Sequence, residues 1–94
     1  MTDTRELDPL LDFTGKVVLI TGAAQGLGKL LAEELALRGA KLVLGDIKLE
    51  AVNGVVSEIT SRGGEAIALA CDVSTKSDCA AMVNAAVETF GQLD

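Results

Sequence analysis

The stretch that decides the fold reads Thr-Gly-Ala-Ala-Gln-Gly-Leu-Gly at residues 21–28. An apolar run at 16–21 precedes it, and a helical pattern at 26–38 follows it. A continuous apolar run is typical of a parallel strand that is buried on both faces. Glycines between such a strand and a helix allow a sharp turn and a close approach of backbone to a pyrophosphate. We therefore expect the loop to hold phosphates at the helix N-terminus, where N–H groups favour an anion. The alternative is a glycine-rich turn without a ligand.

The same alternation continues along the chain. Further strands are predicted at 41–46 and 66–73, with helices at 49–62 and from Ser74 or Thr75 onward. Strands that alternate with helices predict a parallel sheet with right-handed crossovers. Each helix also has an expected apolar stripe. These stripes are Leu27, Leu30, Leu31 and Leu35; Leu49, Val52, Val56 and Ile59; and Cys79, Val83, Val87 and Phe90.

The predicted fold is therefore an α/β three-layer Rossmann fold with the order βαβαβα and a parallel sheet of strand order 3-2-1. Residues 1–12 are expected to be an acidic lead-in. Residues 13–94 are expected to be the first half of a dinucleotide-binding domain, truncated before its fourth strand.

Composition excludes several other classes of protein. The net charge is −6, and the eight basic residues form no stripe that could meet a nucleic acid. The start of the chain lacks the apolar run of a signal peptide, and no stretch approaches the roughly 20 apolar residues of a membrane span. Cys71 and Cys79 stand eight residues apart without any histidine, which fits no common zinc spacing. We expect no metal site, two reduced cysteines used as small apolar fillers, and a cytoplasmic location.

The spacing of the glycines identifies a family. Thr21 followed by Gly22, Gly26 and Gly28 departs from the common Gly-x-Gly-x-x-Gly fingerprint and resembles the cofactor signature of short-chain dehydrogenases/reductases. Residues 14–20 resemble the opening strand of that family, and the resemblance spans about residues 10–94. It implies that the loop backbone holds the pyrophosphate and that Leu27 lies beside the cofactor. The cofactor-binding positions predicted in this loop are Gly22, Ala24, Gln25, Gly26, Leu27 and Gly28.

An acidic residue at the end of the second strand indicates which dinucleotide is bound. Asp46 lies close to the expected distance of about 20 residues beyond the glycines. A carboxylate there accepts hydrogen bonds from ribose hydroxyls and repels a 2′-phosphate. The resemblance places basic residues of NADP-binding relatives at Gln25 and Ile47, and both are uncharged here. NAD is therefore predicted over NADP, although Lys48 could offset the repulsion. The alternative role for Asp46 is an N-cap of the next helix.

A second acidic position closes the third predicted strand. Asp72 and Val73 resemble an Asp-Val pair of the family, in which the carboxylate accepts from the adenine amino group and the next N–H meets the ring. The alternative is a cap or turn residue.

The catalytic groups implied by the resemblance are a Tyr, a Lys four residues later, a Ser and an Asn. The chain contains no tyrosine, and we predict no catalytic residue within it. We expect the NAD-binding portion of an oxidoreductase that transfers hydride between NAD(H) and an alcohol or carbonyl. Two alternatives stay open: a free-standing, non-catalytic module for adenine nucleotides, and an interaction fragment that docks to a partner.

The predicted sheet leaves the first strand with one unpaired edge. In the order 3-2-1-4 a fourth strand would lie beside residues 17–20. An open apolar edge recruits another strand readily, so self-association through the first strand is expected. A lead-in containing Leu10, Leu11 and Phe13 could instead cover this edge.

Overall fold

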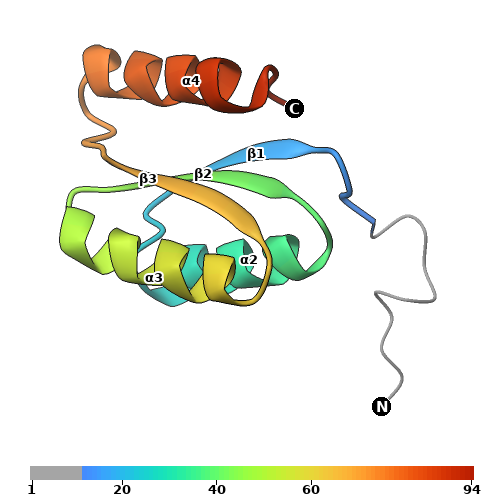
Figure 1. Cartoon of the computed structure of the whole chain (residues 1–94). Coiled ribbons are helices and arrows are strands. Elements are labelled where there is room, and N and C mark those ends of the chain that lie inside the picture. The colour runs from blue at the N-terminus through green and yellow to red at the C-terminus, as the bar shows by residue number, and fades with distance from the viewer. Residues whose placement is uncertain (1–11) are drawn as a thin grey trace.

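The computed structural model describes residues 12–94, which form three strands and three helices in alternation (Figure 1). Residues 1–11, and with them most of the predicted lead-in, lie outside the described residues. The elements follow one another as β1 (Val17–Thr21), α2 (Gly26–Leu37), β2 (Lys41–Asp46), α3 (Leu49–Ser61), β3 (Glu65–Ala70) and α4 (Lys76–Phe90).

The strands form one parallel sheet in the order β1-β2-β3, which confirms the predicted order. Val17 pairs with Lys41, and Lys41 pairs with Glu65, so the three strands begin at the same level. Their carboxyl ends consequently share one edge of the sheet, where the predicted site residues follow each strand. Helices α2 and α3 cover one face and α4 covers the other, giving three layers (Figure 1).

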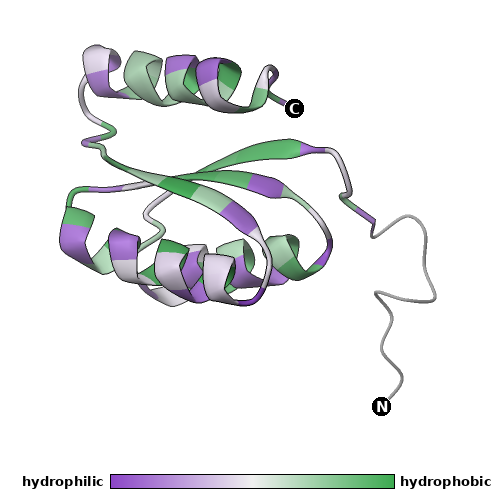
Figure 2. Cartoon of the chain, in the orientation of Figure 1, coloured by the Kyte–Doolittle hydropathy of each residue, from purple (hydrophilic) through white to green (hydrophobic). Residues whose placement is uncertain are grey.

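The strands are mostly hydrophobic along their length (Figure 2), and their side chains alternate between two cores. Ile20, Leu42 and Leu44 face α2 and α3, and both leucines are fully buried. Val17 and Val43 face α4 and pack with its Met82. Because both faces of the sheet are covered, polar residues are excluded from the middle of each strand.

The predicted apolar stripes are correct only in part. In α2 only Leu35 of its stripe is buried, and Ala32 completes the buried face. In α3 Val52 and Ile59 are buried as predicted, together with Val55. In α4 only Phe90 of its stripe packs against the core, and it is partly buried; Cys79, Val83 and Val87 are exposed, and Met82 and Ala86 are the buried residues. Each helix carries apolar residues on more than one side, so periodicity predicts the helix without fixing which side meets the sheet.

The third strand ends earlier than predicted. β3 stops at Ala70, and Asp72 and Val73 lie in a turn before α4. Asp72 Oδ1 accepts hydrogen bonds from the backbone N–H (2.9 Å) and the hydroxyl (2.7 Å) of Ser74. Such a local carboxylate bond favours a turn over a continuing strand. Helix α4 then begins after Thr75, whose hydroxyl accepts from Asp78 N–H at 3.4 Å, in agreement with the predicted cap.

The residues after α4 return to the outer edge of β1. Asp94 N–H donates to the Val17 carbonyl (2.8 Å), and Val17 N–H donates to Asp94 Oδ2 (2.9 Å). Gln92 Nε2 donates to the Gly15 carbonyl at 2.9 Å. The start of the β1 edge is therefore paired by residues 92–94 rather than open along its full length. Within residues 12–94, no helix is both long and apolar enough to cross a membrane.

Candidate functional site at the carboxyl edge of the sheet

The loop between β1 and α2 reverses the chain with two glycines in the left-handed region. Gly22 has φ 65° and Gly26 has φ 61°, values that a residue with a Cβ adopts only at a cost. Ala23 N–H donates to the Gly45 carbonyl at 3.2 Å, which fixes the loop against β2. Ala23 and Ala24 are buried, whereas Gln25 is exposed. The loop is thus a tight backbone surface with little side chain above it.

Gly28 occupies the closest backbone approach in this loop. A Cβ built on Gly28 would fall on the Gly22 carbonyl oxygen and 2.8 Å from its carbon. Only glycine fits there, so the predicted third glycine has a steric reason. Because α2 sits this close to the end of β1, its first turn opens directly at the loop. Gln25 provides no side-chain cap, which leaves the N-terminal N–H groups directed outward, where an anion is stabilised.

Asp46 is held beside this loop by two backbone donors. Its Oδ2 accepts from Ala24 N–H at 3.1 Å, and its Oδ1 accepts from Lys48 N–H at 3.0 Å. The Lys48 N–H, followed by the Ala24 N–H, lowers the pKa of Asp46 below its usual range, so the carboxylate is ionised at neutral pH. A carboxylate has about four acceptor positions. Two are occupied, and the remaining positions can accept ribose hydroxyls.

Asp46 is not the N-cap residue of α3, although it bonds the backbone of the residue that is. The N-cap of α3 is Lys48, which makes no side-chain capping bond. Asp46 bonds the N–H of that N-cap residue and at the same time joins β2 to the glycine loop. It is a link between two loops.

Asp72 acts as a turn residue in this structure. Its Oδ1 holds Ser74, and these bonds, the hydroxyl first, lower the pKa of Asp72 below its usual range. Its backbone N–H donates to Asp78 Oδ2 at 2.9 Å. The other carboxylate oxygen, Oδ2, has no donor among the described residues. The turn reading is confirmed, and a role toward adenine stays a prediction.

The strand ends surround a small hollow of about 130 Å³. We call it the Asp46 hollow. Two apolar side chains that line it are unusually exposed, Ile47 at 72% and Val73 at 63%, and Leu27 at the start of α2 is 79% exposed. Exposed apolar groups beside an ionised carboxylate and free helix N–H groups suit a ligand with a flat apolar ring and polar substituents. The residues that line the hollow are Gly22, Asp46, Ile47, Cys71 and Val73.

Two residues of this region were missed by sequence reasoning. Cys71 is buried and lines the hollow, and Met82 of α4 packs against Gly45. A Cβ on Gly45 would collide with Met82 Sδ and lie 3.0 Å from Cys71 Cβ. The available signal was Gly45 itself, because a glycine inside a strand marks a close approach of another group.

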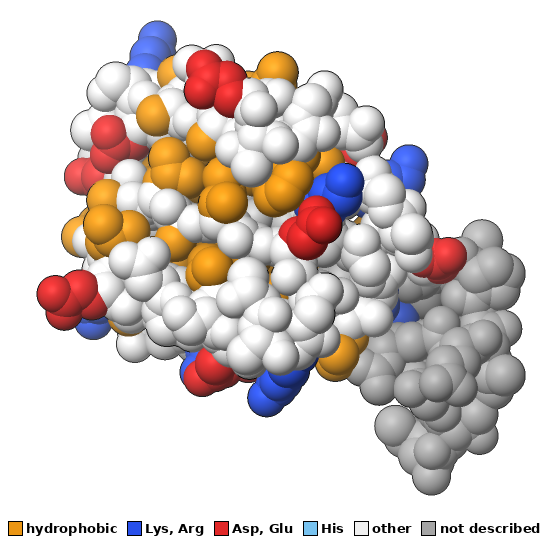
Figure 3. All heavy atoms as spheres, viewed as in Figure 1, with side chains coloured by type: hydrophobic (Ala, Val, Ile, Leu, Met, Phe, Trp, Pro, Cys, Tyr) orange, Lys and Arg blue, Asp and Glu red, His pale blue; other side chains and the backbone are white. Residues whose placement is uncertain are grey.

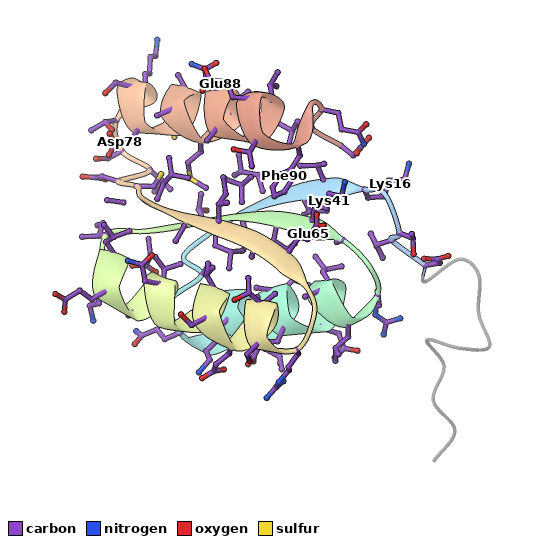
Figure 4. The ribbon with its side chains drawn as sticks, in the orientation of Figure 1. Lys16, Lys41, Glu65, Asp78, Glu88 and Phe90 are labelled. Carbon is purple, nitrogen blue, oxygen red and sulfur yellow. The ribbon has the colours of Figure 1, made fainter. Side chains whose placement is uncertain are left out.

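The other end of the sheet carries paired charges. Lys41 Nζ lies 3.9 Å from Glu65 and 6.0 Å from the centre of the Phe90 ring. Figure 4 shows these three side chains between α4 and the sheet, away from the strand ends that carry the Asp46 hollow. No group of three or more potential metal ligands occurs among residues 12–94.

These elements have the architecture of the first half of a Rossmann fold, and the comparisons with known proteins agree. The model of the short chain dehydrogenase family matches residues 16–94. The chain therefore belongs to the short chain dehydrogenase family, as its glycine spacing predicts.

Named relatives include enzymes with different substrates. A probable tetrahydroxynaphthalene reductase from Zymoseptoria tritici is 50% identical over 93 residues, covering 98% of this chain and 33% of that protein. The 7α-hydroxysteroid dehydrogenase of Escherichia coli is 39% identical over 84 residues, covering 89% of this chain and 33% of the relative. The chain thus spans about a third of the length of the relatives it matches.

Solved structures give the same fold. A hydroxysteroid dehydrogenase from Escherichia coli superposes with a TM-score of 0.87 at 39% identity, over 89% of this chain and 36% of that one. A short chain dehydrogenase/reductase from Burkholderia phymatum, solved in complex with NAD, superposes with a TM-score of 0.84 at 40% identity, over 87% and 29% of the two chains.

Proposed function

We propose that this chain binds the adenosine and pyrophosphate part of NAD(H). The observation that carries the proposal is the Asp46 carboxylate, fixed by Ala24 N–H and Lys48 N–H beside the glycine loop and the N-terminus of α2. In this arrangement the loop and helix N–H groups bind the pyrophosphate and Asp46 accepts the ribose hydroxyls. The relative complexed with NAD supports the choice of cofactor.

The adenine ring would occupy the Asp46 hollow. Ile47 and Val73 provide apolar contacts on its sides, and Asp72 Oδ2 can accept from the exocyclic amino group. Only part of a dinucleotide contacts this chain, so we expect weak binding, with a dissociation constant on the order of 0.1–1 mM.

Selectivity against a 2′-phosphate tests the role of Asp46. AMP and 2′,5′-ADP are titrated against the labelled chain, and amide shifts are followed by NMR. AMP should bind more tightly to the unmodified chain, and the preference should shrink in Asp46→Asn, which keeps the shape of the side chain. Ile47→Arg should move the preference toward 2′,5′-ADP. Glu50→Gln, which removes a nearby charge without touching the hollow, is the matched control. Equal affinities in the unmodified chain would contradict the assignment of Asp46.

As part of the same proposal, the whole protein is an oxidoreductase that transfers hydride between NAD(H) and an alcohol or carbonyl. The reductase and dehydrogenase relatives support this reaction class. The described residues contain no tyrosine or histidine that could serve as the acid or base. We therefore expect the 94-residue chain alone to show no turnover with NAD and an alcohol.

The proposal also includes association through β1 and a cytoplasmic location. Residues 92–94 pair with the start of the β1 edge, but Leu19 and Thr21 lie two and four residues beyond Val17 and direct their backbone groups to the same side. A strand from a second copy could pair there. Two cysteines without a disulfide support the cytoplasm. Sedimentation across a dilution series tests the association, and a monomer at all concentrations would contradict it.

A further inference from the structure

The turn between β3 and α4 brings its two cysteines together. Asp72 N–H donates to Asp78 Oδ2 at 2.9 Å, and the Cys79 thiol donates to the Val73 carbonyl at 3.7 Å. These two contacts fold the first turn of α4 back over residues 72 and 73. Cys71 directly precedes Asp72 and Cys79 directly follows Asp78, so the contact between residues 72 and 78 brings both cysteines to the same turn.

The two thiols differ in exposure, as members of a reactive pair do. Cys79 is exposed, and an oxidant can reach it from solvent. Cys71 is buried at 3% exposure, packed under Gly45 beside Met82. Burial, followed by the nearby Cys79 and Asp78, raises the pKa of the Cys71 thiol. Cys71 is thus protected unless it reacts with Cys79.

We propose that Cys71 and Cys79 are a redox pair that closes to an intramolecular disulfide in the presence of oxidised glutathione. Cys79 first attacks the glutathione disulfide, forming a Cys79–glutathione bond and releasing one glutathione thiol. The Cys71 sulfur then attacks the Cys79 sulfur, and the second glutathione leaves as a thiol. Two protein thiols are oxidised, one glutathione disulfide is reduced, and both protons pass to the released glutathione.

The bond would tie the wall of the Asp46 hollow to the first turn of α4. It closes a loop from residue 71 to residue 79, within which Asp72 and Val73 lie. Because the folded chain already holds the ends of this loop together, the disulfide should form more favourably in the folded than in the unfolded chain.

The experiment measures the equilibrium between dithiol and disulfide in glutathione buffers of graded ratio, with the full chain folded in one arm and unfolded in concentrated urea in the other. Alkylation followed by mass spectrometry distinguishes the disulfide from a glutathione adduct. The equilibrium constant should be at least about tenfold larger in the folded arm, because the unfolded loop holds the thiols only at the millimolar effective concentration of a flexible linker.

Two variants resolve the order of the steps. Cys71→Ser should retain one glutathione on Cys79, because no second thiol displaces it. Cys79→Ser should leave the buried Cys71 unmodified while the chain is folded. If the equilibrium constant for disulfide formation in the folded chain is equal to or below that in the urea-unfolded chain, the proposal is overturned. A stable glutathione adduct on Cys79 in the unmodified chain, or a disulfide between two chains, would overturn it as well.

Discussion

The two faces of the sheet are covered to very different extents. On the face of α2 and α3, Leu42 and Leu44 are fully buried between two helices and the strands. On the other face α4 stands alone, and Leu19, Ile67 and Leu69 are only partly buried. Figure 3 shows hydrophobic side chains gathered on the surface between α4 and the sheet. Val17 and Val43 are buried beneath α4 as well, so the difference lies in the remaining large side chains: Leu42 and Leu44 are closed off by two helices, whereas Leu19, Ile67 and Leu69 stay partly in water.

The largest expected effect comes from the closed core. Leu44→Ala should lower the free energy of unfolding by about 3 kcal/mol, because a fully buried leucine leaves a cavity. Leu69→Ala, in the neighbouring strand but facing α4, should cost about 1 kcal/mol, because the side chain is already partly in water. Urea unfolding at equilibrium measures both variants. Equal losses would show that the two faces are equally well packed.

The second-largest loss of stability is expected at Met82, the residue that packs α4 against the sheet. Met82 is the largest buried side chain of this helix, at 1% exposure, and Met82→Ala should cost about 2 kcal/mol. Val83→Ala, one residue along and 43% exposed, should change stability by no more than about 0.5 kcal/mol. The two variants are compared by thermal unfolding. A larger loss from Val83→Ala would mean that the predicted stripe, and not Met82, faces the sheet.

Two glycines on the α2 and α3 side are expected to respond in opposite directions. Gly28→Ala should destabilise the chain by about 1–3 kcal/mol, since its Cβ would meet the Gly22 carbonyl. Gly54→Ala, inside α3 with open space around it, should stabilise by about 0.5–1 kcal/mol through helix propensity. The urea concentration at the midpoint of unfolding is measured for both variants and for the unmodified chain. A stabilising Gly28→Ala would contradict the close approach of α2 to β1.

The smallest effect concerns the contact that ties the end of α4 to β1. The Val17 N–H, followed by Gln92, lowers the pKa of Asp94 below its usual range. A lowered pKa in the folded state means that this contact stabilises above the ordinary pKa of Asp and is lost as the pH falls through the lowered value. The amide shift of Val17 in NMR should therefore titrate with a midpoint below the ordinary pKa of an Asp side chain, and Asp94→Asn should remove that titration. A midpoint at or above that value would argue against the contact.

The strands and the loop could be predicted from sequence because their constraints are local. The second strand has the predicted bounds, 41–46, Gly22 and Gly26 form the sharp turn in the left-handed region, and Gly28 makes the close contact between helix and strand. Glu34 and Arg38, opposite charges one helical turn apart in α2, likewise form an ion pair at 3.1 Å.

What could not be predicted depends on long-range packing. The end of β3 at Ala70 accompanies the turn that Asp72 forms with Ser74, and Asp78 of the next helix adds a bond to Asp72 N–H. The buried side of α4 is set by Gly45, which leaves room for Met82 on the strand beneath. Cys79 was expected to be an apolar filler and is exposed, because the turn directs it to the Val73 carbonyl. None of these contacts has a periodic signature along the chain.

The most direct test of the account is an NMR titration of the labelled chain with NAD. Binding at the Asp46 hollow should produce saturable shifts in the amides of residues 22–28, together with those of Asp46, Ile47 and Val73, and none in Lys41 or Glu65 at the opposite end of the strands. Shifts confined to that opposite end, or no shifts at NAD concentrations of about 10 mM, well above the expected dissociation constant, would contradict the claim that this half of the fold binds the cofactor.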